Sequence, residues 1–107
     1  MTGINKTQAA PSFGKFIKIK DCTKKEVHDF RKNLNHKSED FLTLAVKDEK
    51  DTKGEKRILY LFSDKHLDKF LEKIQGSMSE FRRNVEYYMG EKPKEMSLKK
   101  AYKKLID

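Results

Sequence analysis

The sequence has few of the residues that build disulfide-bonded or metal-bound cores. Cys22 is the only cysteine among 107 residues, which excludes an internal disulfide and a cysteine-based zinc site and fits a reducing compartment. The three histidines, His28, His36 and His66, show no ligand spacing. The sequence therefore predicts no metal site.

Long apolar runs and phosphate-binding loops are also missing. No apolar stretch approaches the roughly 20 residues of a membrane-spanning helix, and MTGINKTQAAPSFG at the N-terminus has no signal-peptide core. GKFIKIK, residues 14–20, lacks the P-loop pattern. The acidic residues lie among lysines and form no recognisable catalytic pair. We therefore expect a cytoplasmic protein that is not an enzyme and has no cofactor, small-molecule substrate or membrane partner.

Positive charge is abundant and unevenly placed. The net charge is +8, and 39% of residues are charged. Residues 1–20 carry four lysines and no acid, residues 81–107 carry eight basic and four acidic residues, and the region between them is balanced. Basic ends of this kind attract polyanions such as nucleic acid. The alternative is that the charge only keeps the surface solvated.

Hydrophobic periodicity predicts one α+β domain over residues 14–107 after a flexible N-terminal arm, residues 1–13. Apolar alternation indicates strands in three stretches, residues 14–20, 40–50 and 56–63. A helix capped by Thr23 follows the first of them. The predicted order is strand, helix, strand, strand, helix, with a short basic helix over residues 98–106. Helices would cover one face of a sheet of about three strands that is at least partly antiparallel.

A long helix over residues 64–89 is the most conspicuous predicted element. Ser63 is a suitable N-cap, and Gly90 stands where a helix commonly ends. Gly76 followed by Ser77 leaves two alternatives, one kinked helix or two short ones. An apolar stripe extends beyond the reach of one small sheet, and its second half could form a dimer interface through Met78, Phe81, Val85 and Tyr88.

The face of the sheet opposite the helices would carry aromatic side chains among lysines. It is predicted to display Phe16, Phe41, Tyr60 and Phe62 with Lys18, Lys20 and Lys47. Rings that stack on bases and ammonium groups that meet phosphates are what single-stranded nucleic acid requires. The alternative is that these rings form a second buried layer, under the C-terminal helix or a symmetry mate.

Further basic residues could add electrostatic contacts. Arg82 and Arg83 are adjacent in the long helical stretch, and the C-terminal helix exposes a lysine side with Lys99, Lys100, Lys103 and Lys104. That helix could also dock its apolar stripe on the unfilled end of the long helix, which is compatible with phosphate binding.

Residues 40–75, DFLTLAVKDEKDTKGEKRILYLFSDKHLDKFLEKIQ, resemble the end of a PUR repeat, a single-stranded nucleic-acid-binding module with a Whirly-like fold. A strand, a charged turn and a second strand lead into a helix with a phenylalanine in its first turns, here Phe70. The resemblance implies a dimer that binds nucleic acid along the lysines and aromatic residues of its sheet.

Two functions follow from these observations. The first is a small non-enzymatic nucleic-acid-binding protein, with single-stranded DNA or RNA favoured. The second is a protein-interaction or inhibitor domain, dimeric through the long helix, whose charge serves solubility.

Overall fold

The computed structural model describes residues 15–37 and 40–107. The elements of these ranges are, in order, β1 (Phe16–Cys22), α1 (Lys24–Lys37), β2 (Phe41–Lys47), β3 (Arg57–Ser63), α2 (Lys65–Lys73), α3 (Met78–Arg83), α4 (Val85–Met89), β4 (Lys94–Met96), α5 (Leu98–Ala101) and the π-helical segment η3 (Tyr102–Ile106). The predicted α+β class is confirmed. The predicted arm, residues 1–13, lies outside the described residues. No helix in the described ranges has the length and apolar character needed to cross a bilayer.

The sheet is mixed, and within the described ranges it has four strands in the order β2-β3-β1-β4. β3 is antiparallel to both β2 and β1, whereas β4 is parallel to β1. The sequence predicted about three strands and did not include β4. β4 was missed because its three residues carry no apolar alternation, and its register, Ile17 beside Lys94 and Ile19 beside Met96, depends on β1.

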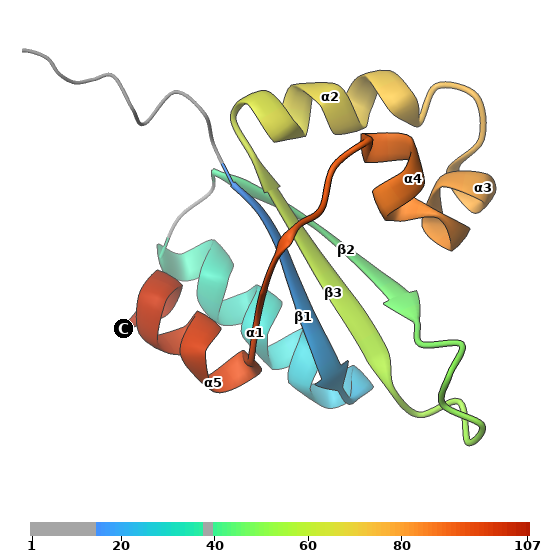
Figure 1. Ribbon diagram of the computed structural model, residues 1–107. Helices are drawn as coiled ribbons and strands as arrows, with labels where there is room; N and C mark the ends of the chain where they lie inside the picture. Colours follow the sequence, from blue (N-terminus) through green and yellow to red (C-terminus); the bar gives the residue numbers. More distant parts are fainter. Residues whose placement is uncertain (1–14, 38–39) are drawn as a thin grey trace, which may run out of the picture.

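Helices cover both faces of the sheet, so the prediction of helices on one face is wrong. Figure 1 shows α2, α3 and α4 on one side and α1 with α5 on the other. The reason lies in β3, where every residue from Leu59 to Ser63 is buried. A strand whose inward and outward residues are both apolar needs cover on both sides.

Each face of the sheet has its own core. The core beneath α2, α3 and α4 contains Phe16, Leu44, Val46, Tyr60, Phe62, Phe70, Phe81, Val85 and Met89. The core beneath α1, α5 and η3 contains Ile17, Ile19, Cys22, Val27, Phe30, Leu34, Leu59, Leu61 and Ala101. Consecutive residues of β1 therefore enter different cores, as the alternation of a strand requires.

The predicted long helix is divided into α2, α3 and α4. After Gly76, the Ser77 hydroxyl accepts a hydrogen bond from the backbone N–H of Glu80 at 3.3 Å and starts α3. A second break at Asn84, with φ −142° and ψ 52°, was not predicted. Gly90 ends α4 in the left-handed conformation, φ 71°. These breaks let α3 and α4 turn back over the sheet, so one small sheet covers much of the apolar stripe, although Leu71 and Met78 remain exposed.

Ser63 does not cap α2, contrary to the prediction. It is the buried last residue of β3, and its hydroxyl accepts a hydrogen bond from the backbone N–H of Lys15 at 2.8 Å. Asp64 takes the N-cap position instead, with a positive φ of 49° and no side-chain cap hydrogen bond. The hydroxyl thus ties the start of β1 to the end of β3.

Candidate functional site

The predicted aromatic platform is buried. Phe16 and Tyr60 are each 5% exposed and Phe62 is fully buried. The Phe16 and Phe62 rings stack at 5.2 Å between centroids, and Phe70 of α2 packs on Phe62 at 4.6 Å. These rings are core residues in this structure, which matches the alternative of a second buried layer, although the cover is α2 to α4 rather than the C-terminal helix or a symmetry mate.

Phe41 lies on the opposite face from the other three aromatic residues. In the β2–β3 register, Leu42 is beside Phe62 and Leu44 is beside Tyr60. Phe41 therefore points toward the second core, against which it is partly buried. The assignment of β2 residues to the two faces was wrong. Alternation shows which residues of one strand share a face, but it does not show which face of the neighbouring strand they match, because that depends on the register between the strands.

The Lys18 side chain is bound by another residue of the same chain. Its ammonium group donates to Glu86 of α4 at 2.6 Å, and the Tyr60 hydroxyl donates to the same oxygen at 3.0 Å. Burial opposes ionisation of Glu86, but these hydrogen bonds and the charge of Lys18 lower the pKa of its carboxyl. Lys20 is exposed and pairs with Glu95 of β4 at 3.3 Å. Neither lysine stands beside an open aromatic ring.

The residues predicted to form a dimer interface are mostly inside the protomer. Phe81 is 1% and Val85 is 3% exposed, Tyr88 is partly buried, and Met78 is exposed at 42%. Phe81 packs edge-on against Phe70 at 5.0 Å. Because α3 and α4 fold back on the sheet, Phe81 and Val85 pack inside the protomer, whereas Met78 remains on its surface. The dimer interface stays a prediction.

The C-terminal helix docks on α1, not on the long helical stretch as predicted. Ala101 is buried, and the Tyr102 ring meets Phe30 of α1 edge-on at 5.1 Å. The predicted contact residues Lys99, Lys100 and Lys103 remain exposed on this segment. Docking and an open lysine side therefore coexist.

Three predicted basic residues meet around one hollow at the end of β2. Lys47, Arg82 and Arg83 line a space of about 300 Å³ together with Val46, Glu49 and Ser79. The Arg82 guanidinium also donates to the backbone carbonyl of Ala45. Glu49 reduces the positive charge of this arginine hollow, which makes it the weaker of two candidate anion sites.

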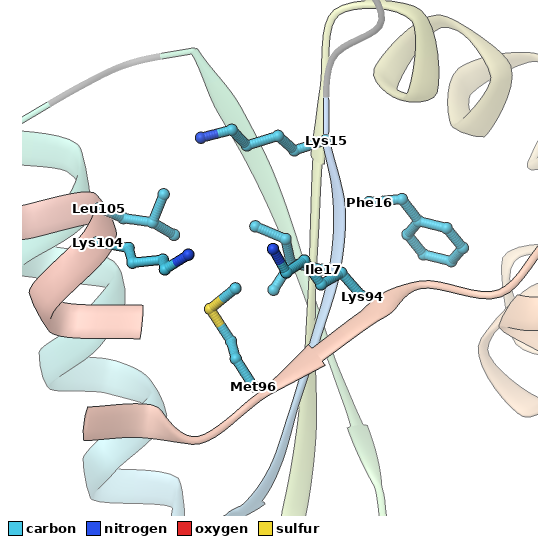
Figure 2. A pocket seen from close by; sticks show the side chains of 7 residues that line it. All are labelled: Lys15, Phe16, Ile17, Lys94, Met96, Lys104 and Leu105. Atoms are coloured by element: carbon cyan, nitrogen blue, oxygen red, sulfur yellow. The ribbon is translucent and has the colours of Figure 1, made fainter. Parts of the chain in front are cut away.

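A second hollow is lined by basic and apolar residues without an acid. Its lining residues are Lys15, Phe16, Ile17, Lys94, Met96, Lys104 and Leu105, around about 280 Å³. Figure 2 shows the side chains of Lys15, Lys94 and Lys104 around the space and the Phe16 ring on the far side of β1. We refer to this space as the lysine hollow. Three segments far apart in sequence, at β1, β4 and η3, supply its three ammonium groups.

Lysines at the lysine hollow repel one another. The pKa of Lys104 is lowered mainly by the charge of Lys94, then by Lys100, burial and Lys15. A bound anion would relieve this repulsion. Of the three lining lysines, only Lys104 was predicted, as part of the basic side of the C-terminal helix, and Lys15 and Lys94 had no assigned role. The excess positive charge at both chain ends was the available signal.

In the described ranges, no group of three or more His, Cys, Asp or Glu side chains is placed to hold a metal ion. Comparisons with protein-family models, curated proteins and solved structures gave no match. The resemblance of residues 40–75 to a PUR repeat stays a prediction.

Proposed function

We propose that the protein binds nucleic acid through phosphate groups at the lysine hollow. The observation that carries the proposal is the convergence of Lys15, Lys94 and Lys104 on one hollow whose lining contains no acid. Ammonium groups attract phosphates with little regard to sequence, and the bound phosphates release counterions, which makes the affinity depend on salt. The role is binding without chemistry.

The chain ends explain why this surface is basic. Lys15 belongs to the basic N-terminal region, whereas Lys94, Lys100 and Lys104 belong to the basic C-terminal region. Parallel pairing of β4 with β1 and docking of η3 on α1 bring these two regions together. Exposed Lys99 and Lys103 extend the same positive segment.

Fluorescence anisotropy with labelled single-stranded and duplex oligonucleotides at two salt concentrations tests the proposal. We expect binding at low salt that weakens as salt rises. The double variant Lys94→Gln/Lys104→Gln should bind more weakly. The slope of log affinity against log salt concentration should decrease in magnitude by about 0.7 for each phosphate contact to a single strand that is lost.

A matched control removes the same charge elsewhere. Lys53→Gln/Lys73→Gln changes two exposed lysines, one in the β2–β3 turn and one at the end of α2. It should leave the salt slope nearly unchanged. Equal losses in the two double variants would show that net charge alone acts, and absence of binding at low salt would remove the proposal.

A protein-interaction domain is the second candidate. The observation in its favour is the exposure of three large apolar side chains on the α2–α4 layer, Leu71 at 48%, Met78 at 42% and Tyr87 at 79%. Single exposed apolar residues are common on protein surfaces, so this observation is weaker than the lysine hollow. Sedimentation equilibrium of the whole chain tests self-association directly, and a mass of one chain at all concentrations would remove the homodimer.

A further inference from the structure

The lysine hollow has an apolar floor that phosphate binding does not use. Apart from Phe16, its apolar lining residues are Ile17 of β1, Met96 of β4 and Leu105 of η3, which we call the floor. Ile17 is 3% exposed, and the other two are partly buried against the same core. Figure 2 shows Ile17, Met96 and Leu105 between and beside the three lysines. A phosphate bound to the lysines alone would leave this apolar surface in water.

The size of the hollow limits what can occupy the floor. Its volume of about 280 Å³ is just below the roughly 300 to 1,000 Å³ of pockets that hold drug-sized ligands. One planar ring system with its attached sugar is of this scale. Met96 suits such a ligand because a flexible, polarisable thioether adapts to the face or edge of an aromatic ring.

We propose that the floor formed by Ile17, Met96 and Leu105 takes one unpaired base of a single strand whose flanking phosphates contact Lys15, Lys94 and Lys104. This inference rests on the proposed nucleic-acid binding and adds a preference for single strands. In a duplex the faces of each base are covered by stacked neighbours and the phosphates lie outside, so a duplex offers the lysines an anion but offers the floor nothing. The preference therefore has a structural basis other than the buried Phe16 and Tyr60 rings.

The decisive probe is an oligonucleotide that keeps its phosphates and loses its bases. Anisotropy is measured with a labelled single strand, an abasic strand of the same length and a duplex, all at one salt concentration. We expect the base-containing strand to bind about two- to tenfold more tightly than the abasic strand, the range of a thioether–aromatic contact. The duplex should bind no more tightly than the abasic strand for the same number of phosphates.

Variants of the floor localise the effect. Met96→Ala should lower affinity for the base-containing strand and leave the abasic strand unchanged. Met78→Ala, at an exposed methionine of α3, is the matched control and should change neither. Met96 also packs against a core, so Met96→Ala could affect the fold. Met96→Leu is a second variant that keeps the side-chain volume, and thermal unfolding of each variant shows whether the fold is retained.

The outcomes separate the inference from the function on which it rests. Equal affinity for abasic and base-containing strands would overturn the base site while phosphate binding stands. Absence of binding to every oligonucleotide at low salt would overturn both. The affinity difference between base-containing and abasic strands could also persist in folded Met96→Ala and Met96→Leu proteins. That result would place the base contact elsewhere and overturn the assignment to this hollow.

Discussion

Arg31 and Arg82 approach the outer edge of β2 from opposite faces of the sheet. Arg31 of α1 donates to the Thr43 hydroxyl at 2.8 Å and to the Thr43 carbonyl at 3.4 Å, while Arg82 of α3 donates to the Ala45 carbonyl. β2 is an end strand of the sheet, so one of its edges has no neighbouring strand in the described ranges. Occupying the Thr43 and Ala45 carbonyls with charged side chains guards an edge that could otherwise pair with another chain.

Arg82→Ala should therefore promote self-association as well as a modest loss of stability. Loss of one hydrogen bond to a carbonyl costs about 1 kcal/mol. Sedimentation velocity across a range of concentrations measures association, and urea unfolding measures stability. Arg83→Ala removes the same charge from the next residue and should stay within about 0.5 kcal/mol of wild type and show no added association. Identical behaviour of the two variants would argue against edge protection.

Acidification should weaken the contact between β1 and α4 through Glu86. Burial of Glu86 raises the pKa of its carboxyl, but hydrogen bonds from Lys18 and Tyr60 outweigh burial and hold this pKa below its ordinary value of 4.5. A lowered folded-state pKa gives stability that is present above the unfolded pKa and is lost as pH falls through the folded one. Urea unfolding between pH 7 and pH 3 should show this loss, beginning below about pH 4.5.

Glu86→Gln should remove that part of the acid sensitivity. At pH 7 the variant should be less stable by about 1 kcal/mol, because the Lys18 side chain, only 16% exposed, loses its charged partner. Lys18→Met with Glu86→Gln completes a double-mutant cycle. A coupling energy near zero would show that the 2.6 Å pair contributes nothing beyond its separate residues.

Substitution of the buried aromatic residues should affect stability and not nucleic-acid affinity. Phe62→Ala should cost about 3–5 kcal/mol, as expected for a large ring removed from a core. Tyr60→Leu removes the ring, and with it the hydroxyl that donates to Glu86, and should leave oligonucleotide affinity at the wild-type value in folded protein. A marked loss of affinity in folded Tyr60→Leu would restore the platform hypothesis.

Phe81→Glu should unfold the protein and not dissociate a dimer. A carboxylate at this 1% exposed position would be buried between α2 and α4 without a partner. Met78→Glu, three residues earlier and 42% exposed, should change stability by about 0.5 kcal/mol or less. Thermal unfolding and sedimentation mass distinguish the two cases. A folded Phe81→Glu protein of half the wild-type mass would support the predicted interface.

Cys22 should be unreactive in the native protein. Burial, with the nearby charges of Glu26 and Asp21, raises the pKa of its thiol to about 11 from an ordinary 9.0. At pH 8 this change alone lowers the thiolate fraction about a hundredfold. Iodoacetamide should label the native chain far more slowly than the urea-unfolded chain. Because the pKa is raised, the stability linked to this thiol is lost as pH rises from about 9 through about 11.

The helix boundaries that could be predicted depend on neighbouring residues. Thr23 and Glu26 form a reciprocal capping box, with hydrogen bonds of 3.1 and 2.8 Å. Ser77 and Gly90 act at helix ends as expected. Ser63 has an equally suitable side chain, yet its hydroxyl accepts from Lys15, 48 residues away, because β1 pairs with β3. A distant strand outweighed the local preference.

The candidate site could be predicted only in part. An excess of charge at both ends is visible in the sequence, and it identified the lysine side of the C-terminal helix, which includes Lys104. Nothing local indicates that Lys15 and Lys94 share a hollow with Lys104, because that depends on a parallel β4 and on η3 packing against α1.

The sequence by itself determined the α+β class, the approximate position of most helices and strands, several helix caps and the excess positive charge at the two chain ends. Hydrophobic periodicity and helix capping depend on residues that are close together in the sequence, so both can be recognised from the sequence alone. Only the tertiary structure decided that Phe16, Tyr60 and Phe62 are core, that Phe81 needs no second chain, and that lysines from both ends surround one hollow. Those outcomes depend on strand register and on the second helical layer, which bring together residues far apart in the sequence.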